Sequence, residues 1–117
     1  MLFSESNQDL NLLEEEKMND NPLQIDYYNI KKAALILRAL NHKLRQQIIK
    51  LIAEEQKVIV TEIYEKLNLK QSVASQHLAL LRKSGIVTTQ RDGRFIYYTI
   101  NTSRIRAIDS LAKDITG

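Results

Sequence analysis

The 117-residue chain contains no cysteine and no tryptophan, one proline and three glycines. The absence of cysteine excludes disulfides, thiolate nucleophiles and thiolate metal ligands. Aromatic residues make up only 6% of the chain, and with so little glycine and proline this favours helices over a β-sandwich. No apolar run approaches the roughly 18 residues that a membrane-spanning helix needs. The first residues, MLFSESNQDL, hold no basic segment followed by an apolar one, so we expect no secretory signal and a cytoplasmic location.

Catalytic signals are also missing. The sequence shows no nucleophile paired with a base, no paired carboxylates in apolar surroundings and no glycine-rich phosphate loop. A chain of this length is expected to form one domain, with a core too small for a large enzyme cleft. We therefore expect neither an enzyme nor a bound cofactor.

Charge is unevenly distributed along the chain. Residues 1–20 hold six Asp/Glu and one Lys, a net charge of −5, and the remaining 97 residues hold 16 Lys/Arg and 8 Asp/Glu, a net charge of +8. We interpret residues 1–22 as an acidic N-terminal arm, either solvated or docked through its leucines, and residues 23–117 as the folded domain. Such a basic domain is typical of nucleic-acid binders, although many other proteins share the property.

The pattern of apolar residues predicts a mainly α-helical domain with a small β-hairpin. Helical spacing is found in residues 23–40, 42–54, 62–67, 71–83 and from 101 or 102 to about 115. Asn41 and Thr61 are expected to cap the second and third of these helices, and Gly85 to end the fourth. The β-branched run 58–60 predicts a short strand, and 86–90 and 95–100 predict a hairpin around Arg91-Asp92-Gly93-Arg94.

Three helices followed by a hairpin are the order of a winged helix-turn-helix domain, in which the second helix of the motif enters the major groove of DNA. The segment 71–83 would be that helix. It contains no acidic residue, whereas an ordinary solvated helix face usually carries Glu and Lys pairs. Its outward side chains can bond bases or phosphates. The predicted DNA-binding residues of this region are Lys70, Gln71, Ser72, Ser75, Gln76, His77 and Arg82.

The hairpin, residues 87–100, would be the wing. Arg91 and Arg94 flank its turn, where their guanidinium groups can reach phosphates or a narrow minor groove. The partner that these features predict is double-stranded DNA.

The first and last helices carry more apolar positions than one small domain can bury. We therefore expect them to form a homodimer interface. The predicted interface residues are Ile30, Leu37, Ile105, Ile108, Ala112 and Ile115.

Residues 40–100 resemble the ArsR/SmtB-type winged-helix repressors of bacteria. The resemblance lies in LNHKLRQQIIKLI (40–52), SQHL (75–78), LRKSGIV (81–87) and RDGR (91–94) followed by Tyr97-Tyr98. It implies a homodimer held by the first and last helices. It also implies a repressor that leaves a near-palindromic operator on sensing a signal, and the sequence does not identify that inducer.

The metal sites of that family are not retained. The resemblance places one site at Ile59, Thr61 and Tyr64, and the other at Thr102, Arg104 and Ile115, among other positions. These side chains are poor or impossible metal ligands. We expect no metal, and the lack of cysteine also excludes a thiol switch. His42 is expected to cap a helix or lie on the surface, and His77 to pack or to bond a phosphate.

The sequence thus predicts a dimeric, sequence-specific transcriptional regulator, most simply a repressor. The alternative is a protein-interaction module on a winged-helix scaffold that does not read DNA sequence. Binding to duplex DNA with a steep salt dependence would separate the two.

Overall fold

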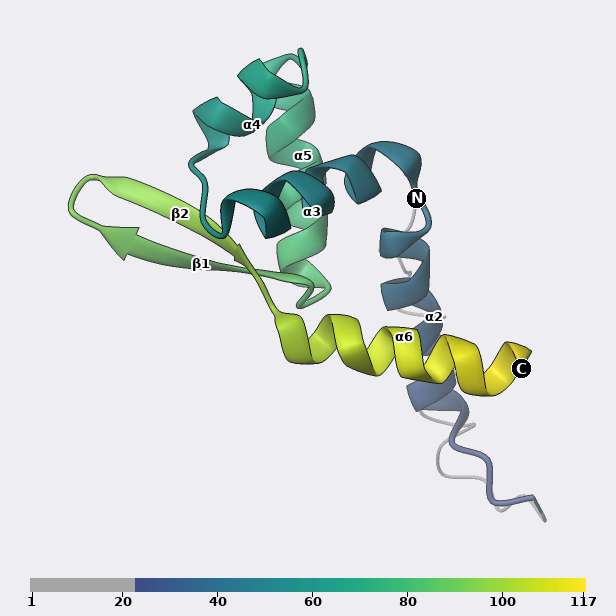
Figure 1. Ribbon diagram of the computed structural model, residues 1–117. Helices are drawn as coiled ribbons and strands as arrows, with labels where there is room; N and C mark the ends of the chain where they lie inside the picture. Colours follow the sequence, from purple (N-terminus) through teal and green to yellow (C-terminus); the bar gives the residue numbers. More distant parts are fainter. Residues whose placement is uncertain (1–22) are drawn as a thin grey trace, which may run out of the picture. The chain divides into compact units, whose positions relative to one another are not determined.

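Figure 1 shows the computed structural model of the protein, which describes residues 23–117. The predicted acidic arm, residues 1–22, lies outside the described residues. Within the described part the chain forms five helices and a two-stranded antiparallel sheet. The elements are α2 (Tyr27–Leu40), α3 (Lys43–Glu55), α4 (Val60–Lys66), α5 (Gln71–Lys83), β1 (Val87–Asp92), β2 (Phe95–Ile100) and α6 (Thr102–Thr116).

Residues 23–38 belong to one compact unit and residues 39–117 to a second. In the first unit α2 begins at Tyr27 rather than at Leu23, because the carboxylate of Asp26 accepts hydrogen bonds from the backbone and side-chain nitrogens of Asn29. Such a bond from an N-cap residue satisfies one of the free N–H groups at a helix start.

In the second unit the core is built from α3, α4, α5, β1 and α6, with single residues from the end of α2 and from two loops. Its buried hydrophobic side chains are Ala39, Ile48, Ile52, Val58, Ile63, Ala74, Leu78, Leu81, Ile86, Val87 and Ile108. On α5 the residues Ala74, Leu78 and Leu81, spaced four and three residues apart on one face, are all fully buried. Burial of these side chains is the main favourable term in folding a domain of this size.

Helix α3 begins one residue later than predicted. His42, and not Asn41, is its N-cap residue, and the Nδ1 atom of His42 accepts from the backbone N–H of Leu44 at 3.1 Å and of Arg45 at 3.4 Å. The prediction that His42 caps a helix or lies on the surface agrees with this geometry.

The prediction of a strand at 58–60, in addition to the two strands of the hairpin, was wrong. Only Val58 pairs with the sheet, through two hydrogen bonds with Tyr98 of 3.1 and 2.7 Å. Ile59 is already the N-cap residue of α4, so the chain turns into a helix before a strand can extend. The predicted cap, Thr61, lies inside that helix.

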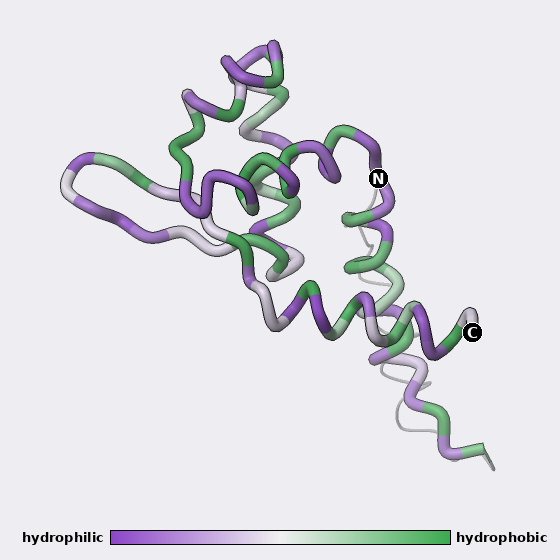
Figure 2. The backbone as a smooth tube through the Cα atoms, in the orientation of Figure 1, coloured by the Kyte–Doolittle hydropathy of each residue, from purple (hydrophilic) through white to green (hydrophobic). Residues whose placement is uncertain are grey.

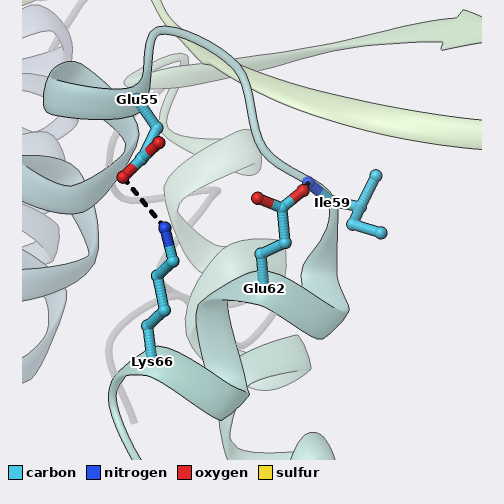
Figure 3. A network of polar contacts seen from close by, with 4 residues as sticks. All are labelled: Glu55, Ile59, Glu62 and Lys66. Carbon is cyan, nitrogen blue, oxygen red and sulfur yellow. Dashed lines mark hydrogen bonds and ion pairs between the residues drawn. The ribbon is translucent and has the colours of Figure 1, made fainter.

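Polar contacts fix the α3–α4 loop at both of its ends (Figure 3). The carboxylate of Glu62 accepts from the backbone N–H of Ile59 at 3.4 Å, and Lys66 forms a 2.9 Å ion pair with Glu55. The bond from Glu62 satisfies a free N–H group at the helix start, which is half of a capping box. The loop therefore has a defined path between α3 and α4.

Helix α5 occupies the residues predicted for it, because both of its ends are specified locally. Before it, Asn68 adopts a φ of 54° and Leu69 N–H bonds Tyr64 O, which closes α4. After it, Gly85 has a φ of 73°, its N–H bonds Arg82 O, and Ile86 N–H bonds Leu81 O. This is a Schellman motif, in which glycine avoids the steric cost of the left-handed conformation.

The hairpin forms as predicted, but its turn is shifted. The strands pair from Val87↔Ile100 to Asp92↔Phe95, which leaves only Gly93 and Arg94 in the turn. Gly93 has a φ of 62° at the first central position, as a type II′ turn requires. Arg91 therefore lies within β1, opposite Ile96. In Figure 2 β1 is mostly hydrophilic, whereas β2 is hydrophobic where it leaves the turn.

Asn101 joins the end of β2 to α6 and to the end of α5. Its Oδ1 atom accepts from Arg104 N–H at 3.2 Å, and its backbone N–H and Nδ2 donate to Ile86 O and Gly85 O, each at 2.9 Å. One side chain therefore caps α6 and binds the segment that follows α5.

No helix within residues 23–117 has the length and hydropathy to span a membrane.

Candidate nucleic-acid interface

Helix α5 presents a polar, acid-free face to solvent. Of the predicted residues in this region, Lys70, Gln71, Ser72, Ser75, Gln76 and Arg82 are all exposed. No aspartate or glutamate occurs from Leu67 to Arg91. Such a face offers hydrogen-bond donors and acceptors to base edges without repelling phosphates.

His77 lies differently from the other predicted residues of α5. It is half-buried, its Nδ1 atom is 3.3 Å from Nη1 of Arg45, and its ring centroid is 5.0 Å from that of His42. Desolvation, with added repulsion from His42 and Arg45, lowers the pKa of His77. The side chain therefore packs against α3 as a neutral ring.

Arg45 is the buried cation of the second unit, with 5% of its surface exposed. Besides contacting His77, its Nε atom donates to the backbone oxygen of Ala39. Burial lowers its pKa, although an arginine retains its charge at neutral pH. Arg45 thus links α3 to His77 on α5 and to the backbone of Ala39.

The wing has two distinct faces. Because side chains alternate along a strand, Val87, Arg91 and Tyr98 lie on the face that continues the core, and Gln90, Phe95 and Tyr97 lie on the opposite face. Arg91 and Arg94 are both exposed. The predicted pair of arginines is thus available to a ligand, one from the core face and one from the turn.

The residues predicted for a dimer interface differ in exposure. Ile30 is 55% exposed and Ile115 71% exposed, Leu37 and Ile105 are half-buried, and Ala112 is exposed. Ile108 is 8% exposed and belongs to the core of its own protomer. The sequence analysis missed Leu111, which is 40% exposed one turn before Ile115 on α6.

Among residues 23–117 no group of three or more His, Cys, Asp or Glu is placed so that it could hold a metal ion. His42 and His77 are neighbours, but His42 uses Nδ1 for capping and His77 directs Nδ1 at Arg45. That the protein binds no metal remains a prediction, because it is inferred only from the shortage of side chains that could act as ligands.

The sequence matches the family model of bacterial regulatory proteins of the arsR family over residues 42–89. It is 34% identical to the transcriptional activator HlyU of Vibrio cholerae, over 71% of this chain and 76% of that protein. The chain belongs to the ArsR family. It is also 32% identical to the transcriptional repressor PagR of Bacillus anthracis, over 79% of this chain and 92% of that protein.

Solved structures of ArsR-family proteins show the same fold. The crystal structure of PagR matches with a TM-score of 0.62 at 31% identity, over 74% of this chain and 98% of that one. NolR from Sinorhizobium fredii matches with a TM-score of 0.65 at 28% identity, over 84% and 95% of the two chains. The resemblance found in the sequence is confirmed. The protein is a DNA-binding transcriptional regulator with a winged helix-turn-helix fold, and it is not an enzyme.

Proposed function

We propose that this ArsR-family protein binds a near-palindromic operator as a homodimer and represses transcription there. Each protomer places the exposed face of α5 in the major groove, and its wing contacts the sugar-phosphate backbone or the adjacent minor groove. The dimer forms through the exposed apolar positions of α2 and α6. Two-fold symmetry of the protein then requires a two-fold related pair of half-sites.

The observation that carries this proposal is the acid-free face of α5 together with the two exposed arginines of the wing. Gln71, Ser75 and Gln76 are exposed and uncharged there, which suits hydrogen bonding to base edges. Arg91 and Arg94 bring full charges on the wing, which suits phosphates. Repression is proposed because PagR, which covers most of this chain, is a repressor. HlyU is an activator, so the direction of control needs its own test.

The test is a mobility-shift titration on the DNA upstream of the protein's own gene, with a scrambled duplex of equal length as control. We expect specific binding, two protomers per duplex and a footprint over a near-palindrome. The logarithm of affinity should fall with the logarithm of salt concentration with a slope of several units. Equal affinity for both duplexes with a flat slope would favour the protein-interaction module. Transcription in vitro should decrease on adding the protein, and an increase would replace repression by activation.

A further inference from the structure

Two cations and two aromatic rings form a continuous series along the wing. The guanidinium of Arg94 lies 5.1 Å from the ring centre of Phe95, and the rings of Phe95 and Tyr97 are 6.3 Å apart. The ammonium of Lys57 lies 4.8 Å from the ring centre of Tyr97. Contacts between rings, and between cations and rings, are attractive at such distances. We call Arg94, Phe95, Tyr97 and Lys57 the aromatic ladder.

The strand register explains why the two rings meet. Phe95 and Tyr97 are two residues apart on β2, so both side chains lie on the face opposite the core face. Phe95 is 41% exposed, although a phenylalanine side chain is usually buried. Its ring is a large apolar surface held between a cation and a second ring at the solvent side of the wing.

Lys57 reaches the wing from a different element. It lies in the α3–α4 loop, after Gln56 with its φ of 72° and before Val58, which pairs with Tyr98 on β2. The contacts of Figure 3 fix the following residues of this loop and the end of α3. The backbone on both sides of Lys57 is thus constrained, and its charge is placed on the wing.

We propose that the aromatic ladder is a DNA-phosphate-binding surface, in which Lys57 contacts the backbone of the duplex together with Arg94. Phe95 and Tyr97 are positioning residues that hold the two cations. A cation that stacks on a ring keeps N–H donors free for a phosphate, and a side chain that is already ordered loses less freedom on binding. This inference rests on the proposed function, because it requires the wing to lie against DNA.

The charge test compares two lysine variants, Lys57→Gln and Lys50→Gln. Both lysines are exposed, but Lys50 lines an open groove between α3 and α4 with Leu51 and Leu67. Affinity for operator and scrambled duplexes is measured from low to moderate salt. Lys57→Gln should lower the salt slope by about one per protomer, hence by about two for a dimer, on both duplexes. Lys50→Gln should keep the wild-type slope.

The positioning test uses the rings. Phe95→Ser should weaken DNA binding roughly two- to five-fold, as expected for the loss of an exposed cation–ring contact, and should reduce the salt slope. Phe95→Tyr keeps a ring and should restore both values. Tyr97→Leu and Tyr97→Phe form a second pair with the same expectation. Melting temperatures identify any variant that has lost its fold.

The outcomes separate this inference from the proposed function. Failure of the wild type to prefer its operator over scrambled DNA would overturn the proposed function. If the wild type prefers its operator but Lys57→Gln has the wild-type salt slope, the proposed role of the aromatic ladder is overturned and the proposed function stands. Equal effects of Phe95→Ser and Phe95→Tyr would overturn the positioning role of that ring.

Discussion

Nη1 of Arg45 on α3 donates a hydrogen bond to Nδ1 of His77 on α5, across 3.3 Å. A guanidinium has donors and no acceptor, so Nδ1 must accept and the imidazole must be neutral. The lowered pKa of His77 agrees with this assignment. The bond joins α5, the helix that would read DNA, to α3. The protonation state of His77 should therefore affect the stability of the fold.

Stability should fall as the pH decreases from about 7.5 to 5.5, and His77→Gln should reduce this fall. An unfolded histidine binds a proton near its ordinary pKa of about 6.5, whereas folded His77 does so only at lower pH. The unfolded state therefore holds more protons in this range, and stability rises with pH. Urea unfolding of both proteins at several pH values measures the difference. Identical pH profiles would show that His77 is not the titrating group.

The helix and the wing should contribute differently to recognition. Gln76→Ala should cost about 1–3 kcal/mol on the operator and little on scrambled DNA, because it removes a bond to a base. Arg94→Ala should weaken both duplexes and lower the salt slope by about two for a dimer. The measurement is the affinity of each variant for both duplexes against salt. An equal loss of affinity on both duplexes for Gln76→Ala would mean that another face of α5 enters the groove.

The proposed dimer can be tested on α6 without damaging the core. Ile115 is 71% exposed, whereas Ile108 is buried, so a charge at Ile108 would disturb the fold itself. Ile115→Glu should give monomers in sedimentation experiments and weaken operator binding. Ser110→Glu adds the same charge on roughly the opposite side of α6 and should leave the dimer intact. A wild type that is monomeric at tens of micromolar (order of magnitude) would contradict the interface.

Zinc, cadmium or nickel at modest excess should leave operator affinity unchanged. The positions that resemble the family's sites lack ligands, and the described residues offer no cluster of three. The comparison is one titration with a chelator and one with each metal. Tight, stoichiometric metal in the purified protein would show that a site has been missed, with His42 and His77 the first residues to replace.

Gly85 should tolerate alanine poorly. Its φ of 73° lies in the left-handed region, where a residue with a Cβ costs about 1–2 kcal/mol. A Cβ at this position would also meet the guanidinium of Arg104 at 3.2–3.4 Å. Gly85→Ala should therefore lower the free energy of unfolding measured in urea, and Arg104→Ala in the same chain should recover the part that comes from this contact. An unchanged unfolding midpoint for Gly85→Ala would contradict the prediction.

Sequence patterns predicted those parts of the fold that are specified locally. Helix α5 was placed correctly because Asn68 and Gly85 mark the turns on either side of it. The strand predicted at 58–60 failed because Glu62 caps a helix start at Ile59, and this overrides the β preference of the run. The position of the hairpin turn was missed by one residue, which moved Arg91 into β1.

Contacts between distant residues could not be predicted in this way. The sequence led us to expect that His77 packs or bonds a phosphate, but not that Arg45, 32 residues earlier, would contact it. Similarly, nothing in the spacing of Lys57 and Tyr97 connects them, because their contact depends on how the α3–α4 loop meets β2. The sequence therefore indicated α5 and the wing as the candidate surface, but it gave no sign of the α3–α4 loop that carries Lys57.

The joint at Asn101 has a consequence for the spacing of the operator. Asn101 bonds Gly85 and Ile86, just past the end of α5, and caps the first turn of α6. These bonds fix α5 relative to α6 within each protomer. In the proposed dimer, the distance and angle between the two copies of α5 then depend only on how the two copies of α6 meet. Such a dimer should accept only one spacing between the two half-sites of the operator. One added base pair at the operator's centre shifts one half-site by about 3.4 Å and turns it by about 35°, a change that this joint would not accommodate.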